Sequence, residues 1–217
     1  MRSFSSVLLQ SKKFVLLGVF IFSHPHQAIT QTFWQSTNGP YGDRVESLVI
    51  NSYGHIFAGT TWNGIFRSID NGNNWVHSGL NNIAITSLAI DRSGHIYAGG
   101  APDHGVFRST DNGESWSPIN AGLTNRNISS LIVNTFGDVF AGTARGGIFC
   151  LRNNEQSWIN TGLSNEFVRA LGVNSQGHIF AGVDWRGIYR SIDNGKSWVL
   201  GHEGLPSSFY WSIVANA

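Results

Sequence analysis

Aspartate side chains recur at regular intervals in this sequence, and their spacing raises the first question of chemistry. Asp70, Asp111 and Asp193 each follow a serine by two positions and precede a glycine by two. Two carboxyl groups that flank a sugar linkage can hydrolyse it, so a glycosidase site must be considered. These aspartates, however, hold the same place in successive copies of one repeat, which distributes them over separate units. We therefore predict no catalytic residue among them.

A metal site is equally unsupported by the repeated residues. Calcium takes six to eight oxygen ligands, whereas each of these short segments offers one carboxylate. The single cysteine, Cys150, excludes both a CxxC metal site and an internal disulfide. The sequence thus predicts no metal and no cofactor.

Arginine and histidine also recur at fixed repeat positions. The arginines could form the kind of cluster that holds a carboxylate, but their repetition favours local hydrogen bonds or packing along aromatic surface. The histidines directly follow a turn glycine and are interpreted as turn or edge residues. The two sets are Arg67, Arg108 and Arg190, with Cys150 in the remaining place, and His55, His95 and His178, with Asp138 in the remaining place.

The elements that position these residues are four tandem units of about 40 residues. Each unit has an apolar strand, a turn, a segment such as GHIFAG, a variable loop, a segment such as GIFRS, and a turn into a strand that begins with tryptophan. Four strands in about 40 residues are typical of a β-propeller blade. The units span 47–86, 87–129, 130–169 and 170–211.

The predicted fold class is therefore all-β, a β-propeller of four-stranded blades. Residues 33–46, which include Trp34, match the end of a unit, and residues 212–217 match the start of another. With four full repeats and a partial blade at both ends, we expect an incomplete or open ring. The continuous apolar run in the first strand predicts that burial decreases from the first strand of a blade to the fourth.

The turn before the tryptophan carries a recognisable motif. It reads SIDNGNNW, STDNGESW and SIDNGKSW, whereas the third unit has LRNNEQSW, for which we expect a looser turn. Aspartate accepts hydrogen bonds from nearby amides, glycine permits positive φ, and tryptophan supplies apolar cover, so the motif is interpreted as structural. Its residues are Ser68, Asp70, Gly72, Trp75, Ser109, Asp111, Gly113, Trp116, Ser191, Asp193, Gly195 and Trp198.

This motif resembles the Asp-box, S-x-D-x-G-x-x-W, of the bacterial neuraminidase repeat (BNR) family. The resemblance covers residues 33–217 and implies a propeller. Asp-box propellers include sialidases, xyloglucanase-type glycosidases, sortilin-type receptors and photosystem II assembly factors. The chain looks most similar to uncharacterised secreted bacterial repeat proteins of this family, which the combination of GHIFAGT with GIFRSTDNG resembles. The resemblance also implies that the Asp-box lies away from any active site.

Positions where the repeats differ are better candidates for function. Strand alternation places the loop between the second and third strands, and the loop that leaves the fourth, on the face opposite the Asp-box turns. Exposed aromatic rings beside polar side chains would suit a carbohydrate or protein ligand. The candidate residues are Trp62, Asn63, Asp103, His104, Arg145, Asp184, Trp185 and Arg186.

Composition and the N-terminus indicate where the protein acts. A net charge of +1 with 12% charged residues offers no basic field for nucleic acid. Basic residues precede the apolar run 14–22, which is shorter than the roughly 20 residues that cross a bilayer. We interpret 1–30 as a signal peptide and predict no membrane span after its cleavage. The expected location is secreted, periplasmic or at the cell surface.

Two functional hypotheses remain open from the sequence. The first is a non-catalytic secreted or cell-surface propeller that acts in binding or assembly. The alternative is an N-terminal fragment of an Asp-box glycoside hydrolase, sialidase-like or xyloglucanase-like, whose catalytic residues lie in further blades. A sortilin-like receptor is less consistent with a chain that has one cysteine.

Overall fold

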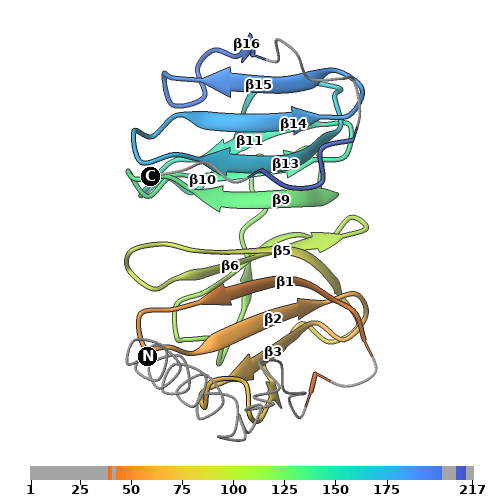
Figure 1. The fold of residues 1–217 in the computed structure, drawn as a ribbon, viewed down its shortest axis with the longest axis vertical. Helices are drawn as coiled ribbons and strands as arrows, with labels where there is room; N and C mark the ends of the chain where they lie inside the picture. Colours follow the sequence, from red (N-terminus) through yellow and green to blue (C-terminus); the bar gives the residue numbers. More distant parts are fainter. Residues whose placement is uncertain (1–38, 41–42, 202–208, 214–217) are drawn as a thin grey trace, which may run out of the picture. The chain divides into compact units, whose positions relative to one another are not determined.

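Strands and turns make up the part of the chain that the computed structural model describes, residues 39–40, 43–201 and 209–213 (Figure 1). These residues fall within one compact unit, Asn38–Ala217. The predicted signal peptide (1–30), Trp34 with its neighbours, and residues 214–217 lie outside the described residues. A search of the described residues found no helix of the length and hydropathy that a membrane crossing requires.

The strands form four antiparallel four-stranded sheets, in each of which neighbours follow chain order. Blade 1 comprises β1 (Val45–Ile50), β2 (Ile56–Thr60), β3 (Ile65–Ser68) and β4 (Val76–His77). Blade 2 comprises β5 (Ala84–Ile90), β6 (Ile96–Ala101), β7 (Gly105–Ser109) and β8 (Ser117–Pro118). Blade 3 comprises β9 (Ile128–Val133), β10 (Val139–Thr143), β11 (Gly147–Leu151) and β12 (Ile159–Gly162). Blade 4 comprises β13 (Val168–Val173), β14 (Ile179–Val183), β15 (Gly187–Ser191) and β16 (Val199–Leu200).

This arrangement confirms the predicted propeller of four-stranded blades. Each first strand begins before the sequence unit to which it belongs, so that the unit 47–86 ends inside β5. The blades contact one another through their first strands, β1 with β5, β5 with β9 and β9 with β13.

A close approach of backbone and side chain joins each blade to the next. A Cβ on Gly59 of β2 would lie 2.5 Å from Ile85 of blade 2, and Gly99 and Gly142 are covered in the same way by Ile128 and Val168. Only glycine leaves room for these branched side chains. Tyr210 covers Gly182 of blade 4 in the same manner, so the chain starts to repeat the pattern once more beyond β16.

Two hydrogen bonds accompany this packing at every junction between consecutive blades, which we call a seam. The first comes from a backbone amide of one first strand to a serine in the first strand of the previous blade, as from Leu88 of β5 to Ser47 Oγ of β1 at 2.9 Å. The second comes from the Asp-box tryptophan, whose indole N–H donates to a carbonyl at the end of the previous blade. The three indole bonds are Trp116 to Ser78, Trp158 to Ile119 and Trp198 to Thr161.

The expected decrease of burial from first to fourth strand is wrong. The second strands are the most buried, with β10 buried at every position, whereas the fourth strands β4, β8 and β16 are exposed. A second strand has a neighbour on both edges and blades against both faces, which removes it from water. In β1, Leu48 is 59% exposed while its equivalent Leu88 is 5% exposed, because the described residues place no blade before blade 1. The ring of described blades is therefore open.

Each Asp-box turn is held together by hydrogen bonds among its own residues, as the turn of blade 2 illustrates. Asp111 accepts hydrogen bonds from Ser109 Oγ at 2.8 Å and from the Ser115 amide at 2.9 Å, and Ser109 Oγ also accepts from the Gly113 amide. Asn112 and Gly113 take φ values of 60° and 83°, the left-handed region that Asn and Gly tolerate best. Hydrogen bonds from Ser115 and Ser109 lower the pKa of Asp111 to about 2.

The lowered pKa of Asp111 predicts a loss of stability in acid. Since the folded pKa lies below the value of about 3.9 for an unfolded aspartate, the stabilisation is complete above about pH 4 and is lost as pH falls through about 2. Asp111→Asn should therefore flatten the decline of the melting temperature between pH 5 and pH 2. Asp103→Asn, at an exposed loop, is the charge-matched control and should keep the wild-type decline. Equal flattening in both variants would contradict this role.

The seam contacts predict unequal roles for the tryptophans. Trp158 is 2% exposed and spans the seam between blades 2 and 3, whereas Trp75 bonds to Gly72 in its own blade. Trp158→Ala should lower the free energy of unfolding by about 3 to 5 kcal/mol in urea denaturation. Trp75→Ala should cost clearly less. Similar losses in the two variants would show that the seam does not depend on the tryptophan.

Candidate functional site

The loops between second and third strands and the connections that leave the fourth strands lie at one end of the blades, here called the loop face. Hydrogen bonds join the two sets, as from the Gly64 amide to the Ile83 carbonyl. At the tips of three of these loops, Asp103, Arg145 and Trp185 have positive φ values of 55°, 69° and 61°. The sequence candidates Trp62, Asn63, Asp103, His104, Arg145, Asp184, Trp185 and Arg186 belong to these loops.

The structure does not gather all of these candidates into one site. Trp62 and Asn63 belong to a loop held by Asp43, which accepts hydrogen bonds from both of their amides at 2.7 and 2.9 Å. Asp103 donates its amide to the Asn127 side chain on a different loop. Arg186 pairs with Glu166 at 3.4 Å. Each of these contacts fixes a loop in place.

Asp184 and Trp185 do meet further side chains. Asp184 is paired in a bidentate manner with Arg169 of β13, at 2.7 Å from Nε and 2.5 Å from Nη2. The hydrogen bonds that Arg169 donates to Asp184 raise the pKa of Arg169. The guanidinium also lies over three aromatic rings, 4.6 Å from Phe167, 5.2 Å from Phe209 and 4.4 Å from Trp211. Arg169 is thus fixed in position by charge and by cation–π contact.

The aromatic rings around Arg169 continue outward to the surface. Trp185 and Phe209 pack edge to face with centroids 4.6 Å apart, and Phe209 lies 6.2 Å from Trp211. Trp185 is 62% exposed and Trp211 is 75% exposed. Together these four residues, Arg169, Trp185, Phe209 and Trp211, are called the aromatic cluster below.

The aromatic cluster borders a pocket of about 460 Å³. Its wall is formed by first-strand residues and loop residues of several blades, including Glu46, Thr86, Asn127, Ser129, Arg169 and Trp211. Sequence reasoning missed Arg169, Phe209 and Trp211. A usable signal existed, because Arg169 stands where the two preceding repeats have the small hydroxyl residues Thr86 and Ser129. Each of these hydroxyls donates to a carbonyl of its own blade and to one across the seam.

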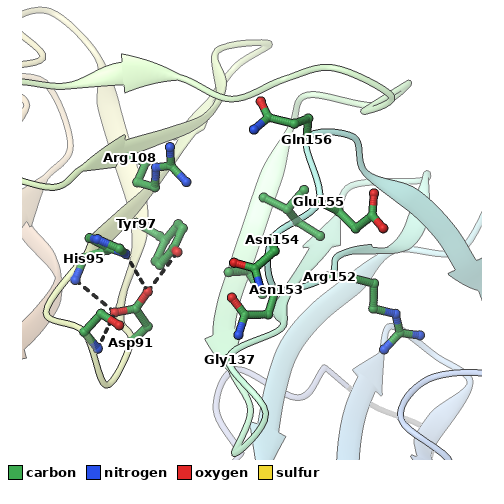
Figure 2. Close-up of a pocket in the computed structure, with 13 residues that line it drawn as sticks. Asp91, His95, Tyr97, Arg108, Gly137, Arg152, Asn153, Asn154, Glu155 and Gln156 are labelled. Atoms are coloured by element: carbon green, nitrogen blue, oxygen red, sulfur yellow. Dashed lines mark hydrogen bonds and ion pairs between the residues drawn. The ribbon is translucent and has the colours of Figure 1, made fainter.

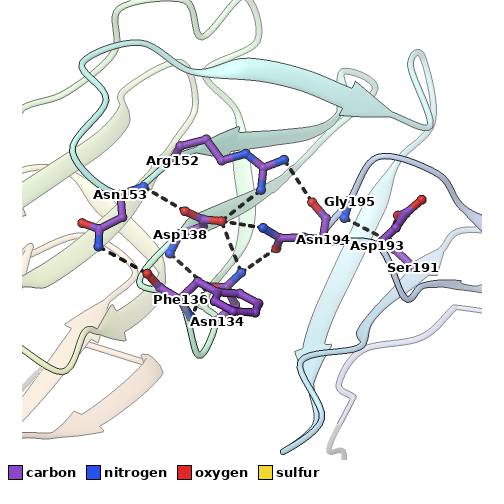
Figure 3. Close-up of polar contacts among 9 residues, drawn as sticks. All are labelled: Asn134, Phe136, Asp138, Arg152, Asn153, Ser191, Asp193, Asn194 and Gly195. Carbon is purple, nitrogen blue, oxygen red and sulfur yellow. Dashed lines mark hydrogen bonds and ion pairs between the residues drawn. The ribbon is translucent and has the colours of Figure 1, made fainter.

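At the opposite end of the blades, called the turn face, an Asp-box asparagine fills the seam between blades 3 and 4 (Figure 3). Asn194 accepts from Asn134 at 2.6 Å and donates to Asp138 at 2.7 Å, and its carbonyl accepts from Arg152 at 3.0 Å. Burial acts to raise the pKa of Asp138, but hydrogen bonds from Asn153, Asn194 and Arg152 outweigh it and lower the pKa overall. The network joins two blades through one side chain.

Asn112 fills the seam between blades 1 and 2 in the same way. It accepts from Asn51 at 2.6 Å and contacts His55 at 2.8 Å, and its carbonyl accepts from Arg67 at 2.8 Å. The expectation that Arg67 bonds locally is therefore wrong, because its partner is in the next blade. Where Cys150 replaces this arginine, Arg152 makes the equivalent bond from two positions further along the chain.

The seam between blades 2 and 3 has no such filling, and Figure 2 shows the space that remains. In blade 3, Glu155 replaces the glycine of the Asp-box and does not adopt its positive φ. Instead of a bridging asparagine there is a pocket of about 320 Å³. Asp91 and Tyr97 line it where the other seams have asparagine and phenylalanine. Tyr97 donates to Asp91 at 3.0 Å, and desolvation together with the Asp91 charge raises the pKa of Tyr97 to about 12.

The described residues were also searched for groups of side chains that could bind a metal ion. Within residues 39–40, 43–201 and 209–213, no three His, Cys, Asp or Glu side chains are grouped so that they could hold an ion.

Two glycines with the same backbone conformation test the importance of the filled seams. A Cβ on Gly113 would lie 2.7 Å from Phe57 of the previous blade, whereas one on Gly54 would meet nothing within 4 Å; their φ values are 83° and 80°. Gly54→Ala should cost about 1 to 2 kcal/mol of unfolding free energy for backbone strain alone. Gly113→Ala should cost about 1 to 3 kcal/mol more because it forces the seam apart. Equal costs in chemical denaturation would show that the Asp-box does not seal the seam.

Comparison with known proteins identifies one of these features. The family model of the BNR/Asp-box repeat matches residues 107–118, which contain the Asp-box turn of blade 2. No curated protein matches the sequence.

Solved structures of known propellers superpose on the chain. An ancestral GH74 enzyme has a TM-score of 0.68 at 21% identity, covering 82% of this chain and 28% of its own. PorZ, an essential surface component of the type-IX secretion system of Porphyromonas gingivalis, has a TM-score of 0.64 at 16% identity, covering 83% and 30%. YCF48 bound to D1 peptide has a TM-score of 0.59 at 16% identity, covering 73% and 54%.

These low identities establish a shared fold and not a shared activity. The chain also spans less than two thirds of each of these structures. The sheet topology, the Asp-box turns and the superpositions nevertheless agree. The protein is a β-propeller, and the turn of its second blade matches the BNR/Asp-box repeat.

Proposed function

We propose that this protein is a non-catalytic propeller that binds a carbohydrate or protein ligand at its loop face, and that it acts outside the cell membrane. The observation that carries the proposal is the aromatic cluster, in which the exposed Trp211 borders a partly polar pocket and the exposed Trp185 continues the aromatic surface through Phe209. Aromatic faces beside fixed polar groups are what sugars and peptide side chains need for binding.

The state of the carboxyl groups supports binding rather than hydrolysis. A glycosidase needs a carboxylic acid with a raised pKa beside a second carboxylate. In the described residues, the carboxyl groups with shifted pKa values, those of Asp43, Asp70, Asp111, Asp138 and Asp193, are all shifted downward. On the loop face, Glu46, Glu166 and Asp184 each hold an arginine.

The location outside the membrane rests on the N-terminal sequence pattern, with its basic start, apolar run and polar end. PorZ, which has the same fold, is a bacterial surface component. The alternative, a piece of an Asp-box glycoside hydrolase, draws on the GH74 superpositions. The chain covers less than a third of those enzymes.

Binding can be tested with a panel of β-glucans, sialosides and peptides, measured by calorimetry. Trp211→Ala should weaken binding of the recognised ligand about tenfold or more, which corresponds to ~1.4 kcal/mol. Trp62→Ala is the matched control, because Trp62 is equally exposed but borders a different hollow, with Asp43 and Arg44. Whether glycans or peptides respond decides the ligand class.

Two results would contradict the proposal. Equal affinities of wild type, Trp211→Ala and Trp62→Ala would remove the aromatic cluster from the binding site. Hydrolysis of a sialoside or β-glucan by the wild type, abolished by one carboxylate substitution, would show that the protein is an enzyme.

A further inference from the structure

The seam between blades 2 and 3 departs from the other two seams at several positions together. Glu155 takes the place of Gly113 and Gly195, and Tyr97 takes the place of Phe57 and Phe140. Asp91 stands where Asn51 and Asn134 donate to the bridging asparagine. These changes lie on both walls of one pocket, so they act on the same space.

The arginine at this seam lacks the partners that its equivalents have. In blade 1, Arg67 contacts the Asn112 carbonyl at 2.8 Å and the Glu114 carboxylate at 2.7 Å. In blade 3, Arg152 contacts the Asn194 carbonyl and the Asp138 carboxylate. Each of these two guanidinium groups thus contacts one neutral carbonyl oxygen and one anionic carboxylate oxygen.

Among the described residues, Arg108 contacts neither a carbonyl nor a carboxylate oxygen of blade 3, which forms the opposite wall of the pocket. Its side chain hydrogen-bonds to Tyr97 on its own wall, and in the described part of the chain it forms no ion pair. The position of Glu114 is occupied by Gln156 in blade 3, which removes the carboxylate. In Figure 2, Arg108 lies on one wall of the pocket, and Asn153, Asn154 and Gln156 lie on the other.

The carboxylate of Asp91, which lines the same pocket, is already engaged. Asp91 accepts hydrogen bonds from the Ser93 and His95 amides, contacts the His95 ring, and accepts from Tyr97. The carboxylate of Glu155 is turned away from Arg108 in Figure 2. The guanidinium, with five donors in a planar fork, therefore faces the pocket with most of its hydrogen-bonding capacity unused.

We propose that the pocket between blades 2 and 3 binds a small organic carboxylate, which pairs with Arg108 and accepts hydrogen bonds from the amide side chains of Asn154 and Gln156. The ligand supplies the anionic oxygen that Glu114 and Asp138 supply to the other two seam arginines. The pocket volume of about 320 Å³ limits it to one small molecule or one side chain. The site is on the turn face and is independent of the ligand proposed for the loop face.

The carboxylate could belong to a sugar acid or to an acidic amino acid, and paired probes separate these sources. Galacturonate is compared with galactose, and N-acetylglutamate with N-acetylglutamine, so that each pair differs in charge at nearly constant shape. Calorimetry and NMR titration of the full chain should show binding of at least one acid and no binding of its neutral partner. The acid that binds identifies the source.

Two variants connect binding to this pocket. Arg108→Gln should weaken carboxylate binding about tenfold or more, because a charge-assisted hydrogen bond is lost. Arg67→Gln, at the filled seam between blades 1 and 2, is the matched control and should bind with wild-type affinity even where it melts at a lower temperature. The double substitution Asn153→Asp with Glu155→Gly restores the aspartate and the glycine of the Asp-box in blade 3, and should abolish binding while Arg108 remains.

Three outcomes would overturn the proposal. Equal binding of acids and neutral partners would exclude carboxylate recognition. Wild-type affinity in Arg108→Gln would exclude this arginine. Binding that appears only in Glu155→Gln would show that Glu155 itself occupies the pocket in the native protein.

Discussion

The contact between consecutive blades is the interaction on which the rest of the structure depends. A branched side chain of one blade covers a bare glycine of the blade before it, as Ile85 covers Gly59, and an indole N–H bonds back across the same seam. A single four-stranded sheet of this size cannot bury both of its faces. Stability therefore arises between blades, which explains why the repeated residues are devoted to seams and turns.

Repetition also determines where binding can occur. The Asp-box aspartate and the bridging asparagines have hydrogen-bond partners within the protein. Ligand binding is therefore expected at positions where the repeats differ. Arg169 breaks it at the loop face, where its partners are rings and a carboxylate, and Glu155 breaks it at the turn face, where a bridge is lost and a pocket remains.

The two departures differ in physical character. At the loop face, Arg169 is paired with Asp184 and stacked among rings, so the surface offers aromatic faces and little free charge. At the turn face, Arg108 lies in a polar pocket without an anionic partner among the described residues. One propeller thereby presents two surfaces of different chemistry, although its superposition on glycosidases, PorZ and YCF48 shows only that they share a scaffold.

The sequence by itself determined the repeat, the propeller fold and the four-stranded blades, because these follow from local patterns that recur in each unit. It also pointed to the loop face. Only the tertiary structure showed that Arg67 and Trp116 act across a seam, that Arg169 meets Trp211, and that Arg108 borders a pocket. Such contacts join residues from different repeats, and their existence depends on how one blade is rotated against the next, which no pattern within a single unit encodes.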